Sequence, residues 1–215
     1  MAIPTDITLK TLKGSWGLDK TLSENMDGIL RLQGVGWLTR KGIGAASQTL
    51  HFTSAVETPP SSSEITVHIT MRQTLTGGIP GSTEERYMDW VERERSNHIY
   101  GDTQSRSRLI KGVRDAGGAV RPDVEIQSKP GNDAIEEEVK KFLSAGVPHL
   151  GSQENDDLSD LYIHDFGRNE KAGWTAEQIW GLEVIDSQQY LTRRVAVVRE
   201  DGYELARLVY KFNGL

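Results

Sequence analysis

The segments KGSW (13–16), NMDGIL (25–30) and GVGWLTRK (34–41) decide the fold. The first carries a tryptophan beside glycine and serine, and it predicts the opening of a strand. The other two hold apolar residues between glycines, which favours two short helices in succession. We therefore expect one strand and then two short helices at the start of the chain.

Each expected helix has its own start and stop signals. Ser23 can cap the first helix, which we expect over residues 24–33, and a shorter helix follows over residues 36–41. A third helix is expected over residues 133–144, with Asp133 as its N-cap. These helices interrupt a chain that otherwise reads as strands.

Short alternating segments dominate the rest of the sequence. Residues 65–72 alternate apolar and polar side chains, which is typical of a half-buried strand. Further strands are expected at residues 83–92, 98–111, 190–199 and 203–212. The last two form a hairpin, because Asp201-Gly202 between apolar-rich runs is a turn signal. So many closely spaced strands predict a mainly β fold, a meander that closes into an antiparallel barrel.

The stretch from residue 113 to residue 172 departs from this pattern. It is rich in glycine and proline, it contains the third expected helix, and alternation fades within it. We expect residues 1–215 to form a single domain in which 113–172 is an insertion between barrel strands. Two interpretations stay open, namely a lid over the barrel mouth and a solvated excursion without a functional role.

Composition narrows the function classes. The 215 residues carry a formal net charge of -6, which disfavours a nucleic-acid partner. The absence of cysteine excludes disulfides and thiolate nucleophiles. The N-terminal residues lack the apolar core of a signal peptide, and no apolar run is long enough for membrane insertion. We expect a cytoplasmic protein, and the sequence leaves open whether two copies form a homodimer.

The common catalytic motifs are missing from the sequence. It has neither a Gly-x-Ser-x-Gly elbow nor a P-loop, and its five histidines lack the helical spacing of metal ligands. No metal and no cofactor is therefore expected. The chemistry that remains is the binding of a hydrophobic small molecule in a cavity, with a few polar groups to orient it.

The opening segments resemble the intracellular fatty-acid-binding proteins of the calycin superfamily. In that family a Gly-x-Trp strand precedes two cap helices, and the second helix often carries Gly-Val-Gly, an aromatic residue and Thr-Arg-Lys. The resemblance implies a closed calycin-like β-barrel with a helix-turn-helix cap and an internal cavity. Family members often bind a carboxylate with an inward Arg-x-Tyr on the last strand. Here Arg207 and Tyr210 are three residues apart, so alternation puts them on opposite faces, with Arg207 outward.

The segments GWTAEQIWG (173–181) and RLVY (207–210) resemble a second group, the fungal lipocalin-like proteins. Some of these are cofactor-free enzymes for Diels–Alder and hetero-Diels–Alder cyclisation in tropolone-sesquiterpenoid biosynthesis. The resemblance implies a cofactor-independent cyclase that acts on a polyketide-like or terpenoid-like substrate. Two alternatives remain, a non-catalytic carrier of hydrophobic molecules and a dehydratase or isomerase that uses a tyrosine or histidine as its acid.

Strand alternation supplies the candidate site residues. The expected substrate-binding residues are Leu208, Tyr210 and Phe212 on the last strand, together with Tyr87 and Trp90, of which at most one faces inward. Tyr190 and Arg194 share a face and are the catalytic candidates, although an alternative arrangement puts Val195 inside and Arg194 outside. Trp37 in the cap is expected to pack against the barrel.

Overall fold

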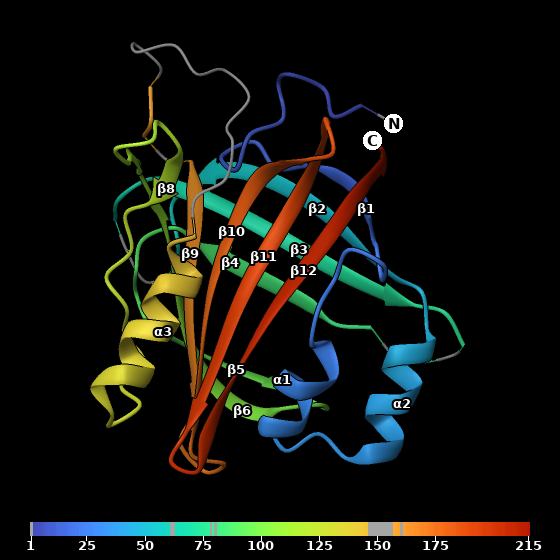
Figure 1. Cartoon of the computed structure of the whole chain (residues 1–215). Coiled ribbons are helices and arrows are strands. Elements are labelled where there is room, and N and C mark those ends of the chain that lie inside the picture. The colour runs from blue at the N-terminus through green and yellow to red at the C-terminus, as the bar shows by residue number, and fades with distance from the viewer. Residues whose placement is uncertain (1, 61–62, 78, 80, 146–156, 160) are drawn as a thin grey trace.

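Ten antiparallel strands form one curled sheet (Figure 1). The computed structural model describes residues 2–60, 63–77, 79, 81–145, 157–159 and 161–215. The strands of this sheet are β1 (Gly14–Leu18), β2 (Gln48–Glu57), β3 (Thr66–Leu75), β4 (Thr83–Tyr87), β5 (Arg93–Asn97), β6 (Gly101–Ile110), β9 (Tyr162–Asn169), β10 (Trp174–Ile185), β11 (Gln188–Arg199) and β12 (Gly202–Gly214). A separate two-stranded sheet holds β7 (Gly112–Arg114) and β8 (Val120–Pro122). The expected mainly β class is confirmed.

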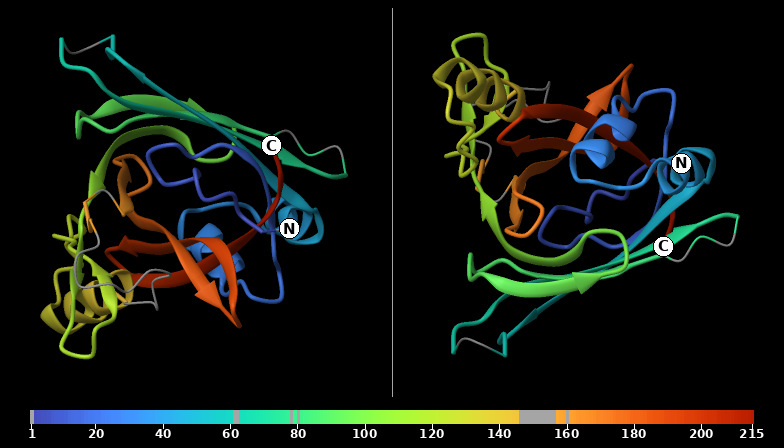
Figure 2. Two further views of the ribbon diagram at one scale, coloured as in Figure 1. Left: turned by 90° about the horizontal axis from the view of Figure 1, so that it is seen from above. Right: turned by 90° about the horizontal axis from the view of Figure 1, so that it is seen from below.

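The sheet curls around an interior without sealing it completely. Its strand order is β4-β3-β2-β1-β12-β11-β10-β9-β6-β5, so the first and last strands pair and β4 and β5 are the edges. Figure 2 shows the sheet wrapped around the interior when it is viewed along the strands. In the part of the chain that the structure describes, no ladder joins β4 to β5. Closure at this edge depends on single contacts, such as the hydrogen bond from the Trp90 amide to the Ser107 carbonyl at 2.9 Å.

An apolar core fills one end of the curl. Alternate residues of β12 point into it, because its inner face is apolar while Arg207 and Lys211 lie on the other face. The core unites β12 with side chains from the neighbouring strands and from the N-terminal segment, namely Leu9, Leu12, Trp16, Leu50, Phe52, Met71, Trp180, Leu191, Leu208, Tyr210 and Phe212. The predicted β11–β12 hairpin is confirmed, with Glu200 and Asp201 between the strands.

Two short helices cover the other end, α1 (Met26–Leu32) and α2 (Trp37–Ala45). The expected cap by Ser23 is wrong, because α1 begins after Asn25, which lacks a side-chain capping bond. The Ser23 hydroxyl donates instead to the Asp19 carbonyl at 2.6 Å and accepts from the Val209 amide at 2.9 Å. Ser23 therefore ties the chain to β12 just before the helix.

Trp37 does not pack against the barrel as expected. Its side chain is 63% exposed, because Ile43 is the buried residue of α2 and the first turn of the helix faces solvent. The third helix, α3 (Asp133–Leu143), is confirmed, but its cap is Asn132 rather than Asp133. The Asn132 side chain accepts from the amides of Ala134 and Ile135, as an N-cap does.

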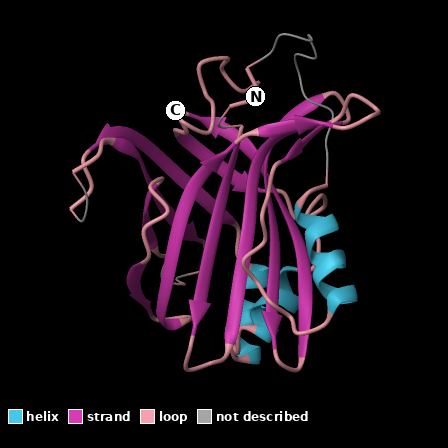
Figure 3. Ribbon diagram, turned by 90° about the vertical axis from the view of Figure 1, so that its left-hand side faces the viewer, coloured by secondary structure: helices cyan, strands magenta, loops and turns pink. Residues whose placement is uncertain are grey.

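The described part of residues 113–172 does not form a lid. Helix α3 lies against the convex face of the sheet, where Val139 and Leu143 pack on β10 to β12 (Figure 3). The end of the expected insertion is also wrong, because β9 pairs with β6 and β10 inside the main sheet. Alternation fades in β9 because both of its faces are buried. Most of the acidic stretch 154–160 lies outside the described residues.

Candidate functional site

The interior holds a cavity of about 460 Å³ between the cap helices and the apolar core. Residues from α1 and Ile43 of α2 line its capped end, and the inner faces of β4–β6 and β9–β12 form its wall. The interior therefore contains a cavity, as predicted from the resemblance to the fatty-acid-binding proteins. Its lining is partly polar. Three arginines and two buried or half-buried acids project into it, namely Arg86, Arg95, Arg193, Glu84 and Asp165.

A buried ion pair crosses the interior from the β4 edge to β9. Arg86 Nε lies 3.0 Å from Asp165 Oδ2, and both side chains are only 8% exposed. Arg86 Nη2 also contacts Glu84 at 2.5 Å, while the indole N–H of Trp180 donates to Asp165 Oδ2 at 2.9 Å. Because β4 has no strand ladder on its outer side among the described residues, this pair is a main link between β4 and the opposite wall.

The pKa values of this pair move apart, as those of a stable ion pair do. Burial alone would raise the pKa of Asp165, but the charge of Arg86 and the hydrogen bonds from Ser107 and Trp180 outweigh it and hold that pKa below its ordinary value. Burial likewise opposes the charge on Arg86, yet Asp165 and Glu84 raise the pKa of Arg86. Both groups are therefore charged at neutral pH, and neither is suited to proton transfer there.

Arg193 on β11 is the cation that is best placed to act on a ligand. Its Nε donates to Gln178 Oε1 at 2.6 Å, and its guanidinium carbon lies 4.8 Å from the centre of the Trp180 ring. Strand pairing explains this arrangement, because Arg193 stands opposite Trp180 and next to Leu208 on the inner face. These contacts, with a further polar contact to the Tyr210 hydroxyl, hold the guanidinium in place, and its remaining N–H groups can reach a ligand in the cavity.

Further polar groups lie in the cavity wall near the cap. Tyr100 is a lining residue, and desolvation outweighs the nearby charge of Arg193 and raises the pKa of its phenol to about 12. Tyr100 is therefore neutral and can donate a hydrogen bond. The Trp174 indole N–H and Asp165 Oδ1 are buried without a hydrogen-bond partner among the described residues. Such groups are rare in folded proteins and mark places where a ligand or water can bind.

This arrangement can orient and polarise a substrate, and it offers little else. Fixed donors such as Arg193 and Tyr100 can stabilise negative charge that develops on a substrate oxygen in a transition state. The aromatic and aliphatic walls can hold two reacting groups face to face. Among the residues that the structure describes, no three histidine, aspartate or glutamate side chains gather as metal ligands.

The last-strand candidates lie on the inner face. Leu208 lines the cavity, whereas Tyr210 and Phe212 are buried deeper in the apolar core. The Tyr210 ring stacks on Trp180 with 6.2 Å between ring centres. Burial raises the pKa of Tyr210 more than the nearby Arg193 lowers it. Tyr210 supports the floor on which Arg193 lies.

The other two aromatic candidates, Tyr87 and Trp90, lie outside the cavity. Tyr87 stacks on His68 with 4.2 Å between the ring centres, on the outer face of β3 and β4. Trp90 covers His164 on the convex face, and the guanidinium of Arg108 lies 4.2 Å from its ring centre. The expectation from alternation failed here because β4 ends at Tyr87 and the chain turns at Trp90, where φ is 60°.

The two catalytic candidates also lie on the convex face. Tyr190 is buried there and its hydroxyl donates to Gln188. Arg194 pairs with Glu183 at 3.3 Å, and its guanidinium carbon lies 5.6 Å from the centre of the Phe142 ring of α3. Arg207 is outward as expected, with Nη2 2.5 Å from Glu183. The structure therefore favours the arrangement with Val195 inside, and the cationic group of β11 in the cavity is Arg193.

A second buried pair, His164 and Glu177, fixes the chain at residues 127–128 to the convex face of the sheet. His164 and Glu177 are both fully buried, with Nε2 of His164 2.7 Å from Oε1 of Glu177. The same carboxylate accepts the backbone amides of Gln127 and Ser128 at 2.9–3.0 Å. Neither residue of the pair lines the cavity, so we assign the pair a structural role.

Replacing Glu177 with alanine should lower the free energy of unfolding by about 2–3 kcal/mol, because buried amides and His164 lose their acceptor. The amides of Gln127 and Ser128 should exchange hydrogen faster than in the wild type. Urea denaturation measures the change in stability, and hydrogen exchange of the Gln127 and Ser128 amides measures the change in protection. Glu177→Gln keeps one acceptor oxygen and should fall between the two proteins, and unchanged protection of these amides in the alanine variant would contradict the assignment.

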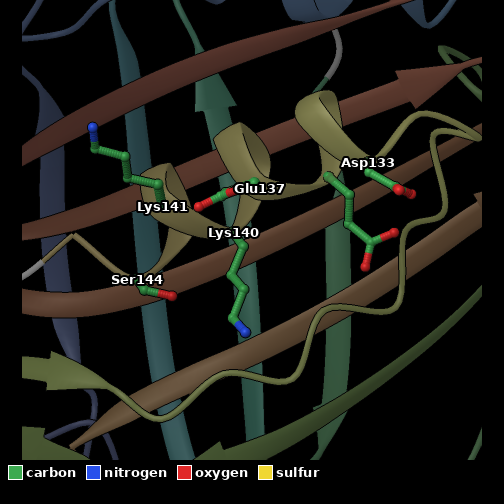
Figure 4. A pocket seen from close by; sticks show the side chains of 6 residues that line it. Asp133, Glu137, Lys140, Lys141 and Ser144 are labelled. Carbon is green, nitrogen blue, oxygen red and sulfur yellow. The ribbon is translucent and has the colours of Figure 1, made fainter.

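A second hollow, of about 550 Å³, lies on the outer surface beside α3. Figure 4 shows that its lining side chains come from this one helix, and they include Asp133, Glu137, Lys140, Lys141 and Ser144. It is the polar, solvent-facing side of α3 and gathers no groups from a second element, so it is a poor candidate for a site. Among the described residues, no helix is both long and apolar enough to span a membrane.

Two relatives with assigned names match nearly the whole chain. The probable pericyclase scpY of Mollisia scopiformis is 26% identical over 213 residues, which is 99% of this chain and 95% of the relative. The pericyclase pydY of Acremonium sp is 28% identical over 218 residues, which is 100% of this chain and 97% of the relative. No family model matches the chain.

Solved structures of fatty-acid-binding proteins also align with this chain. The protein from Manduca sexta has a TM-score of 0.48 at 14% identity and covers 93% of this chain and 98% of its own. The protein from brain tissue of Drosophila melanogaster has a TM-score of 0.48 at 16% identity and covers 92% of this chain and 95% of its own.

Proposed function

We propose that this protein is a cofactor-independent pericyclase of natural-product biosynthesis in the cytoplasm. It binds a hydrophobic substrate pair in the cavity and directs a [4+2] or hetero-Diels–Alder cycloaddition. Two relatives named as pericyclases match nearly the full chain and support this proposal. The observation that carries it is the guanidinium of Arg193, held by Gln178 above the Trp180 ring inside the cavity.

The reaction needs only the groups that the cavity offers. A cycloaddition forms two σ bonds from π electrons of the two partners and releases no atom, so it requires no nucleophile and no proton donor. Positioning of the reacting ends can supply roughly 7–11 kcal/mol of the barrier in favourable cases. A hydrogen bond from Arg193 to a carbonyl of the electron-poor partner draws electron density from it and lowers the barrier further.

Passive carriage of a hydrophobic molecule is the second candidate function. The cavity under the α1–α2 cap favours it, because a carrier needs the same partial shelter from water. A carrier binds its ligand one to one and leaves its covalent structure unchanged. A pericyclase changes the rate of product formation and the ratio of stereoisomers.

The test is a cycloaddition followed with purified protein. An o-quinone methide, generated in situ, is mixed with an electron-rich alkene, and chiral chromatography measures the rate and isomer ratio. We expect faster formation and enrichment of one stereoisomer. Thr103→Trp, which fills part of the cavity from β6, should return both values toward those of the uncatalysed reaction. The same rate and isomer ratio with and without wild-type protein, together with one-to-one binding, would favour the carrier.

A further inference from the structure

Among the residues that the structure describes, two of the three cavity arginines have no carboxylate within ion-pair distance. Arg86 has two carboxylates, but Arg95 has only the Ser105 hydroxyl, to which its Nε donates at 2.7 Å. Arg193 has two neutral partners, the Gln178 amide oxygen and the Tyr210 hydroxyl. Within the described ranges, no carboxylate lies within ion-pair distance of Arg95 or Arg193. Both side chains line the cavity, one from the β5 edge and the other from β11.

The surroundings of Arg95 disfavour its positive charge. Desolvation is the largest effect on its pKa, and the neighbouring charge of Arg86 lowers that pKa further. A half-buried cation next to a second cation is costly unless a negative group completes the site. The charges of Glu84, Asp165 and Glu85 raise the pKa of Arg95 in part, but desolvation and Arg86 outweigh them. Glu84 and Asp165 are hydrogen-bonded to Arg86, and neither forms an ion pair with Arg95 among the described residues.

We propose that the cavity recognises an acidic oxygen group of its ligand, a carboxylate or an enolate, through Arg95 with Arg193 as the second cation. The inference rests on the proposed function and narrows it, because the substrate is then an anionic amphiphile rather than a neutral hydrocarbon. Its acidic group lies toward the β5 edge and its apolar body lies against Leu208, Val195 and the cap helices.

The two arginines of the proposed anion site come from β5 and β11 and not from the last strand, β12. Arg207 of β12 points away from the cavity and is engaged by Glu183 on the convex face. Guanidinium groups suit oxyanions because they present several N–H donors in one plane. The hydrogen bond of Arg95 uses Nε and leaves its terminal N–H groups for a ligand. Arg193 is bonded to Gln178 through Nε and also contacts the Tyr210 hydroxyl, so only part of its guanidinium remains for this purpose.

Two fluorescent probes that differ in one group test the inference. The first is 1-anilinonaphthalene-8-sulfonate, and the second is N-phenyl-1-naphthylamine, which lacks the sulfonate. Fluorescence titration gives the Kd of each probe for the wild type, Arg95→Met, Arg193→Met and Arg121→Met. Arg121 pairs with Asp115 near the two-stranded sheet, outside the cavity, and is the matched control. Thr103→Trp should weaken both probes, which places them in the cavity.

We expect Arg95→Met to raise the Kd of the sulfonate probe about tenfold, which is the loss of one charge-assisted hydrogen bond. Arg193→Met should act in the same direction, and Arg121→Met should change neither probe. The neutral probe should keep its Kd within about twofold in all three variants. Equal losses for both probes, or no binding of the sulfonate by the wild type, would overturn the inference. The experiment involves no turnover, so a failed cycloaddition with intact anion selectivity would reject only the proposed reaction.

Discussion

Replacing Arg86 with methionine should lower the free energy of unfolding by about 3–5 kcal/mol at neutral pH, the range for breaking a buried ion pair. Asp165, which is 5% exposed in the wild type, would keep hydrogen bonds from Ser107 and Trp180 but lose its cation, and Glu84 would lose its partner as well. Urea denaturation followed by tryptophan fluorescence measures the change. The loss should be among the largest for a single substitution, because Arg86 is also a main connection of the edge strand β4 to β9.

The deficit should depend on pH in a direction that the pKa of Asp165 fixes. In the wild type that pKa lies below 3.8, so the pair stabilises the fold above that value and its contribution is lost as pH falls through the lower, folded value. Without Arg86, burial raises the pKa of Asp165, and the folded state then binds the proton more tightly than the unfolded state. The deficit of Arg86→Met should therefore be larger at pH 7 than at pH 5.

A double variant separates the unpaired charge from the loss of packing. Arg86→Met combined with Asp165→Leu removes both charges and should recover much of the lost stability, because apolar replacements of buried pairs are often tolerated. Arg121→Met, whose pair with Asp115 is exposed, should change stability by less than about 1 kcal/mol. A double variant no more stable than Arg86→Met would show that the interior requires the charges themselves.

Sequence reasoning was reliable where a turn signal or the alternation along the last strand was sufficient. The hairpin of β11 and β12 was predicted from its turn and from apolar alternation, and the inward placement of Leu208 followed from the same pattern. The segment 173–181, used for the resemblance, alternates less regularly, because both faces of β10 are largely buried. Its residues Trp174, Gln178 and Trp180 face inward. Trp174 and Gln178 line the cavity, and Trp180 lies in the apolar core beneath it.

The polar part of the cavity could not be read in the same way. Strand β9 buries His164 on one face and Asp165 on the other, so apolar alternation is absent and the strand resembles a loop in the sequence. The partner of Asp165 is Arg86, which lies 79 residues earlier in the chain. Burial of such residues depends on a distant partner of opposite charge, and local periodicity carries no information about that partner. The same limit hid Arg193, because alternation gives a charged residue no reason to face inward.

Replacing Arg193 with methionine should lower the rate constant for cycloaddition in the bound complex by about 10²–10³, the cost of removing a fixed donor from a transition-state oxygen. Methionine keeps much of the volume against Trp180, so the cavity and the bound complex should persist. Single-turnover kinetics with saturating protein measure the rate in the complex separately from binding. Gln178→Leu should give a smaller loss, because the guanidinium remains but is no longer held at Nε.

The adjacent residue provides the matched control. Arg194→Met removes an arginine from the same strand, but its guanidinium lies on the convex face against Glu183 and Phe142. Its effect should be confined to stability, with the rate in the complex within about twofold of the wild type. The expectation from sequence alone, which named Arg194, requires the reverse order. Because strand alternation separates the two guanidiniums by the thickness of the sheet, one pair of variants decides which face of β11 meets the substrate. A large rate loss in Arg194→Met with none in Arg193→Met would move the reaction out of the cavity.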